Sequence, residues 1–242
     1  MTLLKPILYF SLFKYPLTEE EIFNFSKATS KEQIKLDLNE LVNDNIIYKI
    51  DDFYLTENNE TLIKRRLEGN KMAKNIYQKA LTISRLISKF PYVEGVGISG
   101  SLSKGYYDDD ADIDFFIITS PKRLWIARTF LILYKKIFLL NSKKYFCVNY
   151  FISSNALEIE EKNIFTATEL TTLLPMYGNG SFHKFYDENK WVENYLPNKT
   201  VTDGLSKLQV VKKPTATKIT EYFLDSKIGD WLDAAFLRIT YK

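Results

Sequence analysis

The sequence predicts a mixed protein of the α/β (α+β) class, in which helices pack against a small mixed sheet. Apolar residues with helical spacing fill long stretches near both ends of the chain, whereas helices and short β-type runs alternate between about residues 70 and 155. That order places helices on a sheet. We expect three parts: a winged-helix-like domain over 1–68, a core with the sheet over 69–155, and a helical C-terminal region over 156–242.

Residues 1–68 carry the signals of three helices and a hairpin. An apolar helix over 3–13 is ended by Tyr15-Pro16. Two polar pairs with capping-box spacing each start a further helix: Thr18 with Glu21, and Ser30 with Gln33. Two short β-type runs follow, over 46–50 and 53–56. Three helices and a hairpin predict a winged helix.

The third of these helices decides whether this part is expected to bind duplex DNA. Lys31 and Lys35 on that helix are offset by Glu32, Asp37 and Glu40. Residues 1–68 hold nine Lys and Arg against twelve Asp and Glu, so this part is net acidic. A DNA-binding head would need the opposite sign of charge. We therefore favour an interaction or packing module and expect no tight binding to duplex DNA.

The core and the C-terminal region are expected to alternate helices and strands, then to become helical. A long helix over 62–89 contains Gly69, which marks a possible break and domain boundary. The expected strands cover 93–99, 112–119 and 145–153, with a helix over 124–140 between the last two. The later expected helices cover 168–174, 181–195 and 217–241.

The amino-acid composition limits which cellular compartment and which binding partners are expected. The net charge of +3 is too small to indicate a nucleic-acid partner by itself. The apolar stretch 124–140 carries Arg128, Lys135 and Lys136, which a bilayer would disfavour, so no membrane partner is expected. Cys147 is the single cysteine and cannot form an intramolecular disulfide, which favours the cytoplasm. Within its apolar strand we interpret it as a buried, inert thiol.

Glycines cluster where the first strand of the core ends. Gly95, Gly97, Gly100 and Gly105 fall within eleven residues, although the whole chain has nine glycines. Such a cluster indicates tight turns or close approach of the backbone to another group. At Gly100-Ser101, backbone N–H groups and a hydroxyl could meet phosphate oxygens. An ordinary turn has the same composition and stays open as the alternative.

Carboxylates gather just after that turn. Five acids lie within seven residues: Asp108, Asp109, Asp110, Asp112 and Asp114. Residues two apart on a strand face the same side, so the side chains of Asp112 and Asp114 project together. The apolar run that follows shows that this strand is largely buried, and paired carboxylates there repel each other unless a cation or hydrogen-bond donors compensate. Oxygen ligands suit Mg²⁺. Asp108, Asp109 and Asp110 fit solvated side chains of a surface loop, and we assign them no role.

The segments Gly97-Ile98-Ser99-Gly100-Ser101-Leu102-Ser103-Lys104-Gly105 and Ala111-Asp112-Ile113-Asp114-Phe115-Phe116-Ile117-Ile118 resemble the DNA polymerase beta-like nucleotidyltransferase superfamily. The family pattern is Gly-Ser, about ten residues, and Asp-x-Asp opening an apolar strand. The resemblance covers roughly residues 70–155. The whole chain also resembles a prokaryotic group with an N-terminal winged helix and a helical C-terminal tail.

The resemblance implies a nucleotide site and a reaction. Asp112 and Asp114 would hold Mg²⁺ bridging a nucleoside triphosphate such as ATP, while Gly100, Ser101 and nearby backbone N–H groups would hold its phosphates. Lys104 could approach a phosphate, or could be a solvated lysine of the turn. An acceptor hydroxyl would attack the α-phosphate and release pyrophosphate. The acceptor (a small molecule, RNA or protein) and the base are left open.

One departure from the family pattern separates two hypotheses. Active members commonly carry a third carboxylate on a later strand, but the strand 145–151 has no acid, and Asn149 is its nearest polar candidate. Another carboxylate could replace it, with Glu158, Glu160 and Glu161 as candidates. The protein is then a nucleotidyltransferase. With only two acids, it would instead be a nucleotide-binding or regulatory interaction module.

Overall fold

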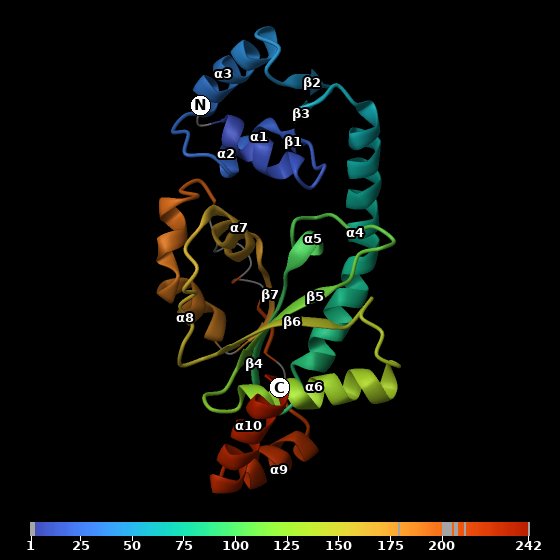
Figure 1. The fold of residues 1–242 in the computed structure, drawn as a ribbon, viewed down its shortest axis with the longest axis vertical. Coiled ribbons are helices and arrows are strands. Elements are labelled where there is room, and N and C mark those ends of the chain that lie inside the picture. Colours follow the sequence, from blue (N-terminus) through green and yellow to red (C-terminus); the bar gives the residue numbers. More distant parts are fainter. Residues whose placement is uncertain (1–2, 179, 200–204, 206–207, 211, 242) are drawn as a thin grey trace. The chain divides into compact units, whose positions relative to one another are not determined.

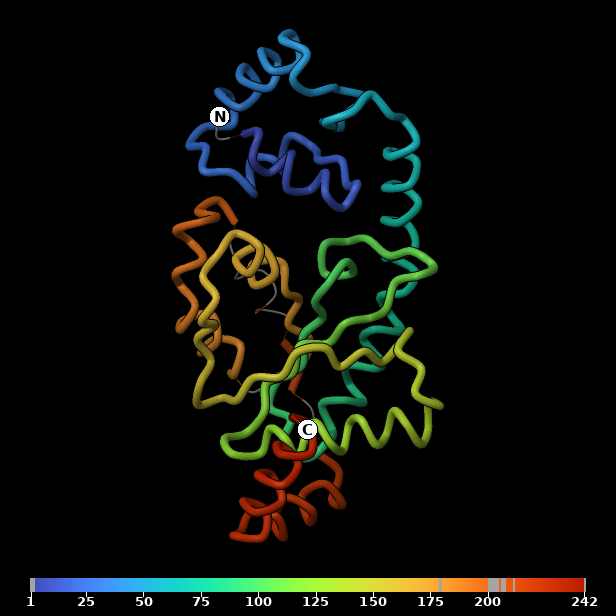
Figure 2. The backbone as a smooth tube through the Cα atoms, in the orientation of Figure 1, coloured from blue at the N-terminus to red at the C-terminus, as the bar shows by residue number. Residues whose placement is uncertain are grey.

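The computed structural model describes residues 3–178, 180–199, 205, 208–210 and 212–241 (Figure 1). The chain forms two compact units, and each unit is assembled from separate segments. Unit 1 comprises residues 1–72, 161–171 and 191–200, and unit 2 comprises 73–160, 172–190 and 201–242. Figure 2 allows these passages of the chain from one unit to the other to be followed. The predicted region 156–242 is therefore shared between the two units.

Unit 1 contains three helices and a small antiparallel sheet near its N-terminus. The helices are α1 (Leu4–Ser11), α2 (Glu19–Asn24) and α3 (Lys31–Asn43). The strands are β1 (Leu17–Thr18), β2 (Tyr48–Ile50) and β3 (Phe53–Leu55), in the order β1-β3-β2. The predicted capping box is present, because Thr18 and Glu21 exchange hydrogen bonds at the start of α2. The helices and hairpin lie where predicted, β1 is additional, and the winged-helix assignment stays a prediction.

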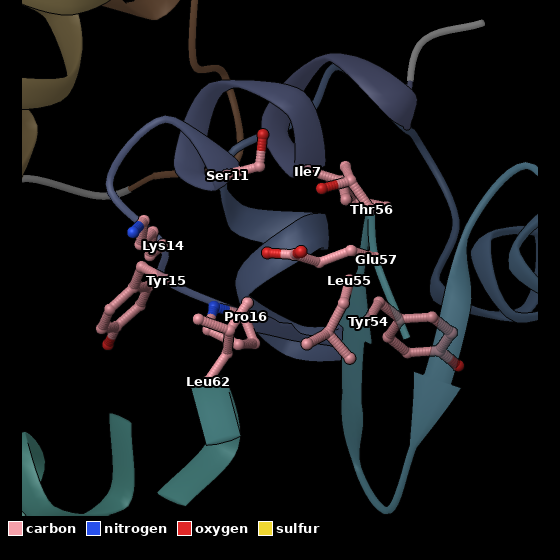
Figure 3. A pocket seen from close by; sticks show the side chains of 10 residues that line it. All are labelled: Ile7, Ser11, Lys14, Tyr15, Pro16, Tyr54, Leu55, Thr56, Glu57 and Leu62. Atoms are coloured by element: carbon pink, nitrogen blue, oxygen red, sulfur yellow. The ribbon is translucent and has the colours of Figure 1, made fainter. Parts of the chain in front are cut away.

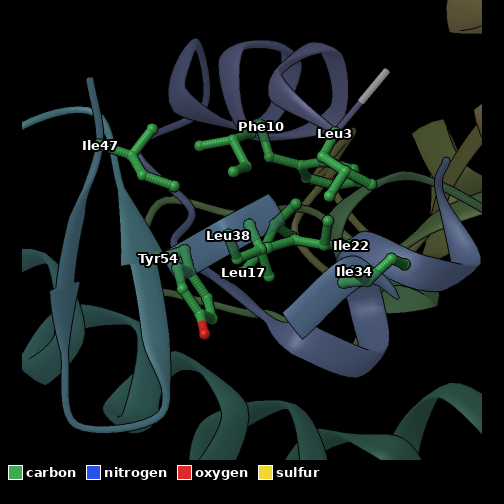
Figure 4. Packing of buried hydrophobic residues seen from close by; sticks show 9 residues of the cluster. Leu3, Phe10, Leu17, Ile22, Ile34, Leu38, Ile47 and Tyr54 are labelled. Atoms are coloured by element: carbon green, nitrogen blue, oxygen red, sulfur yellow. The ribbon is translucent and has the colours of Figure 1, made fainter. Parts of the chain in front are cut away.

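The core of this three-helix arrangement consists of aliphatic and aromatic side chains (Figure 4). Helical spacing brings Leu3, Ile7 and Phe10 of the first helical segment to one side, and Ile34 and Leu38 of α3 face them. The remaining members are Leu17, Ile22, Ile47 and Tyr54. Burying each large aliphatic side chain stabilises the fold by roughly 1.5–3 kcal/mol. The sequence periodicity thus accounts for this core.

A long helix, α4 (Glu60–Ile87), belongs to both units. The expected break at Gly69 is absent, and Gly69 is buried within the continuous helix. A single glycine costs a helix only about 1 kcal/mol relative to alanine, which packing easily overrides. The boundary between the units falls between Met72 and Ala73, inside the helix.

Arg66 of α4 is a buried charged residue of unit 1 that contacts several other segments of this unit. It is 6% exposed, and its guanidinium forms two 2.8 Å hydrogen bonds with the Glu21 carboxylate. It also donates to the Pro16 carbonyl and lies over the rings of Tyr15 and Phe53 at 4.3 and 4.6 Å. A buried charge needs such complete pairing. Arg66 therefore joins α4 to α2 and the hairpin.

A small cavity opens at the surface of unit 1 between α1 and β3 (Figure 3). Its volume is about 20 Å³, and its lining includes Ser11, Tyr15 and Glu57. That volume holds roughly one water molecule, far less than a nucleotide requires. This cavity is thus not the nucleotide site.

Unit 2 is built on a four-stranded mixed sheet with the order β6-β5-β4-β7. The strands are β4 (Val93–Ile98), β5 (Asp114–Thr119), β6 (Cys147–Ser153) and β7 (Leu174–Gly178). The central pair β4–β5 is antiparallel, whereas β5 and β6 are parallel and are connected through α6 (Leu124–Phe138). β7 was not predicted. Its Pro175 pairs with Gly97 at the edge of the sheet, where proline is tolerated.

Helix α8 (Ser181–Glu188) packs on the face of the sheet that carries Phe116. Phe182 and Phe185 approach the Phe116 ring, with centroid separations of 6.4 and 5.1 Å. Gly95 and Gly97 lie directly beneath this helix, and a Cβ atom on Gly95 would come within 2.8 Å of Ser181 Oγ. Gly95 and Gly97 therefore allow α8 to pack closely against the sheet. The expected helix over 181–195 ends with α8 and resumes as a 3-10 turn, η1 (Lys190–Asn194).

The C-terminal region continues with two helices where one was expected. The predicted helix over 217–241 is divided into α9 (Thr215–Leu224) and α10 (Lys227–Thr240), because Ser226 is extended with φ −153°. α10 packs against α6, where the Asp233 carboxylate accepts a 2.9 Å hydrogen bond from the Ile126 amide. The remaining helix, α7 (Ile164–Thr172), precedes β7. Within the described residues, no helix has the length and apolar character needed to cross a bilayer.

Candidate functional site

Asp112 and Asp114 lie where the chain enters β5. Their neighbours Ile113 and Phe115 are fully buried, whereas both aspartates are partly exposed. Both carboxylates act electrostatically on the Cys147 thiol. Asp114 opens β5 and Asp112 precedes the strand, so the shared side expected from their i, i+2 spacing stays a prediction.

Gly100 begins the four-residue helix α5 (Gly100–Ser103), directly against Asp114. Its φ of +67° favours glycine, and a Cβ atom at this position would lie 2.4 Å from Asp114 Oδ2. The Ser99 amide also donates a 2.9 Å hydrogen bond to the Asp114 carbonyl. The backbone of the Gly-Ser turn and the second aspartate are thus in contact, and a larger residue at position 100 would be strained and would displace the Asp114 carboxylate.

Ser101 lies in α5, and Lys104 follows directly as its C-cap residue. The partly buried Ser101 hydroxyl forms no hydrogen bond within the described part of the chain. Lys104 Nζ donates to the Gly100 carbonyl at 3.1 Å, so the ammonium folds back over α5. The first amides of a helix have no partner within that helix. Hydrogen-bond donors and a positive charge therefore lie together beside the aspartates.

The strand beside β5 presents Cys147, and not Asn149, next to Asp114. In the parallel β5–β6 pair, Asp114 is opposite Cys147, and Phe115 is opposite Val148. The register then shifts, so Asn149 has no partner on β5 and is exposed. The shift brings Tyr150 opposite Phe116, where their rings stack at 5.2 Å. The sequence interpretation of Asn149 as the third-acid position missed this bulge, which a single sequence does not reveal.

The Cys147 thiol is strongly perturbed by its surroundings. Burial raises its pKa from 9.0 to about 12, helped by a hydrogen bond to Asp114 and the negative charges of Asp114 and Asp112. The thiol therefore stays protonated at neutral pH. The structure differs from the expected buried thiol, because Cys147 is half-buried and lies next to Asp114. The signal was available in part, since Cys147 opens its strand as Asp114 opens β5.

In the described part of the chain, no third carboxylate joins the two aspartates. Glu158, Glu160 and Glu161 are exposed on the segment between β6 and α7. Across the described residues, no three His, Cys, Asp or Glu side chains are grouped as a metal site. The structure thus brings Gly100 and Cys147 next to Asp114, and Asp112 precedes Asp114 by two residues.

A further residue of this region was not singled out from the sequence. Tyr107, in the loop from α5 to β5, is 3% exposed, and its hydroxyl has no hydrogen-bond partner among the described residues. Burial raises the pKa of this phenol, as do the nearby Tyr145 and Asp112. Its neighbour Tyr106 differs, because that hydroxyl donates to Asp108 at 3.0 Å.

One segment of the chain matches a known protein family. Residues 81–172 match the family model described as nucleotidyltransferase domain, and this segment contains β4, α5, β5, α6 and β6. The match confirms the resemblance to the DNA polymerase beta-like nucleotidyltransferase superfamily for these residues and supports nucleotidyl transfer as the general activity. Comparisons with curated proteins and with solved structures gave no match.

Proposed function

We propose that this protein transfers a nucleoside monophosphate from a nucleoside triphosphate to a hydroxyl acceptor in a Mg²⁺-dependent reaction. The observation that carries the proposal is the contact of Gly100 with Asp114, two residues after Asp112, inside the segment that matches the nucleotidyltransferase domain. The single cysteine supports a cytoplasmic location. The acceptor is a small molecule, an RNA or a protein.

The side chains fit Mg²⁺ in donor chemistry. Asp112 and Asp114 supply hard carboxylate oxygens, and both are partly open to solvent. Mg²⁺ commonly uses one or two carboxylates and completes its shell with water and substrate phosphates. Bound there, it would neutralise charge on the triphosphate and stabilise the transition state. Asp112 and Asp114 are the residues that would hold it.

The residues of α5 would orient the triphosphate. The Ser101 hydroxyl and the first amides of α5 are available donors, and the Lys104 ammonium lies over the same turn. They would hold the phosphates while the acceptor oxygen bonds to the α-phosphorus and the bond from that phosphorus to the bridging oxygen breaks. Pyrophosphate then leaves, and the acceptor hydroxyl loses its proton. Fixed donors favour that step by electrostatic stabilisation.

A second candidate function is nucleotide binding without transfer. It is favoured by one observation: the strand position beside Asp114 holds Cys147, and no third carboxylate is grouped with the aspartates in the described part of the chain. A protonated thiol cannot take the acceptor proton. General-base assistance is typically worth a hundredfold or more in rate. Such a protein would sense nucleotide or support an assembly.

The first experiment tests binding. We would titrate the full chain with Mg²⁺ and each nucleoside triphosphate by calorimetry and compare wild type with Asp112→Ala and Asp114→Ala. Both variants should lose metal-dependent nucleotide binding. Asp110→Ala is the matched control, because Asp110 is exposed on the preceding loop and is assigned no role. Unaltered binding by Asp114→Ala would contradict both candidate functions.

The second experiment separates transfer from binding. Protein, Mg²⁺ and each α-labelled triphosphate would be incubated with cell extract, followed by a search for labelled products. Labelled product from wild type, absent with Asp114→Ala, would establish transfer. Nucleotide binding without any labelled product, across all four triphosphates, would support the second candidate.

A further inference from the structure

The end of α6 and the loop that follows it expose large apolar side chains (Figure 1). Leu133, Ile137 and Phe138 are exposed on the last turns of the helix, and Leu140, just beyond it, is 90% exposed. The first turn of α6 differs, because it is covered by α10. Folded proteins commonly expose apolar residues singly, so four within eight positions indicate a contact surface.

Leu140 projects outward from a backbone conformation that does not favour leucine. Its φ of +47° lies in the left-handed region, which glycine adopts most easily. The side chain gains almost no burial that would offset this strain. Packing within the described chain therefore does not explain a leucine at this position, whereas a contact with another molecule would.

Lysines lie among these apolar side chains, and no acid balances them. Four occur within ten residues: Lys135, Lys136, Lys143 and Lys144. None of the four forms an ion pair with the residues that the structure describes. Residues 115–157 contain seven Lys and Arg but no Asp or Glu. The first two lysines also suit the negative end of the α6 dipole, but the other two lie outside the helix. The surface therefore complements an anionic partner.

We propose that the end of α6 and the loop before β6 dock on an anionic lipid surface, with the apolar side chains among the headgroups and the lysines beside lipid phosphates. Apolar residues next to lysines are typical of helices that lie in a membrane interface. The expectation of no membrane partner concerned a helix that spans the bilayer, and the same lysines suit a position at its surface. RNA would use the lysines but not the aliphatic side chains, because bases stack on aromatic rings. A lipid surface accounts for both.

The test measures co-sedimentation of the full chain with vesicles of phosphatidylcholine, with and without phosphatidylglycerol. Wild type should bind the anionic vesicles, and less so as salt is added. Lys136→Glu with Lys143→Glu should weaken binding at least tenfold, because each basic residue near an anionic surface contributes about fivefold in affinity. Lys35→Glu with Lys184→Glu is the matched control. It makes the same change in charge at exposed sites on α3 and α8, and should bind as wild type does.

Leu140→Gly tests the apolar contribution at constant charge. It should weaken vesicle binding by about tenfold, since a buried leucine side chain contributes at least that much. Without vesicles, its thermal midpoint should be unchanged or higher, because glycine adopts a positive φ without strain. Leu36→Ala, at an exposed leucine of α3, is the control and should leave vesicle binding unchanged.

Three outcomes would overturn the inference. Wild type would bind neither kind of vesicle, the two lysine substitutions on the surface would leave binding unchanged, or Leu140→Gly would lower the midpoint and reveal a structural role for this leucine. A labelled single-stranded RNA serves as a further probe, and its binding without any vesicle binding would assign the surface to nucleic acid. None of these measurements requires nucleotide or Mg²⁺, so they do not depend on the proposed function.

Discussion

At the scale of single residues, the site depends on how little space Gly100 leaves beside Asp114. A methyl group at position 100 has to displace the carboxylate, since the Cβ atom would lie 2.4 Å from Oδ2. Gly180 offers the matching case, because it too has a positive φ, +82°, but nothing within 4 Å of an added Cβ. A comparison of substitutions at these two positions therefore separates the effect of backbone strain from the effect of a collision with Asp114.

The first prediction compares these two substitutions. Gly100→Ala should lower the free energy of unfolding by about 1–3 kcal/mol and abolish Mg²⁺-dependent nucleotide binding, because Asp114 is displaced. Gly180→Ala should cost a similar backbone strain but leave nucleotide binding intact. Urea unfolding and calorimetric titration measure the two effects. Nucleotide binding by Gly100→Ala at wild-type strength would show that Asp114 is not a ligand.

The second prediction concerns the strand position beside Asp114. Cys147→Asp adds a third carboxylate opposite Asp114, so it should tighten Mg²⁺ binding by about tenfold through added ligand charge. In the absence of metal, the same variant should be less stable, because three like charges repel each other. Asn149→Asp is the control, since Asn149 is exposed at the bulge. Tighter Mg²⁺ binding by Asn149→Asp alone would restore the interpretation based on sequence.

The third prediction follows from the raised pKa of the Cys147 thiol. Between pH 9 and about 12 the unfolded thiol ionises while the folded one remains protonated. The folded state then binds more protons, so the free energy of unfolding falls as pH rises through that window, and the contribution is fully present below pH 9. Urea unfolding of wild type and Cys147→Ser at pH 8, 9 and 10 measures this. Parallel pH profiles for the two proteins would rule out the burial of this thiol.

These residues show which parts of the site sequence reasoning can reach. Asp112 and Asp114 could be singled out because the apolar strand that follows them is a local property of the chain. The position of Cys147 next to Asp114 was missed. It depends on the register between β5 and β6, which arises from tertiary packing.

At the scale of elements, the start of α6 depends on a residue far along the chain. The Asp233 carboxylate of α10 accepts a hydrogen bond from the Ile126 amide in the first turn of α6. Close by, Arg123 donates to Asp230 at 2.7 Å and joins the same two helices. Burial raises the pKa of Asp233, so the negative charge of this carboxylate is disfavoured, although its oxygen accepts the hydrogen bond from Ile126.

The fourth prediction uses that distinction. Asp233→Ala removes the cap and should lower the free energy of unfolding by about 1 kcal/mol. Asp233→Asn retains an oxygen acceptor without a buried charge, so its stability should equal or exceed that of wild type at pH 7. Thermal unfolding of both variants provides the comparison. Equal loss of stability in the two variants would show that the charge, rather than the hydrogen bond, stabilises α6.

Periodicity predicted the elements better than their ends. The helices of unit 1 and the strands β4, β5 and β6 follow from capping residues and apolar runs in the sequence. β7 was not predicted because proline and glycine, here Pro175 and Gly178, usually mark the ends of elements. This segment forms a strand only through its pairing with β4. The division between α9 and α10 at Ser226 was not predicted either, because no glycine or proline at this point in the sequence indicates a helix end.

At the scale of the whole molecule, the chain passes between the two units several times. Residues 161–171 and 191–200 complete unit 1, although they are remote from its first 72 residues in sequence. Asn198 shows the consequence, because its side-chain amide donates to the carbonyls of Phe23, Ser26 and Ala28. A fragment of residues 1–68 would lack this contact, so functions of unit 1 have to be tested on the full chain.

The last prediction is that the full chain binds duplex DNA only weakly. The described α3 exposes Lys31 and Lys35 beside the acidic Glu32 and Glu40, and residues 1–68 are net acidic. Attraction to phosphates then stays within the range of non-specific binding, about 10⁻⁴–10⁻⁶ M at physiological salt. Fluorescence anisotropy with a labelled duplex, repeated at several salt concentrations, measures the affinity and its salt dependence.

A charge-reversed variant provides the matched control for this measurement. Glu32→Lys with Glu40→Lys changes the charge of α3 by four, so DNA affinity should rise and depend more steeply on salt. The core residues of α3, Ile34 and Leu38, are untouched, so the fold should persist. Sub-micromolar binding by wild type with a steep salt dependence would contradict the prediction, because it would require a basic surface that α3 does not present.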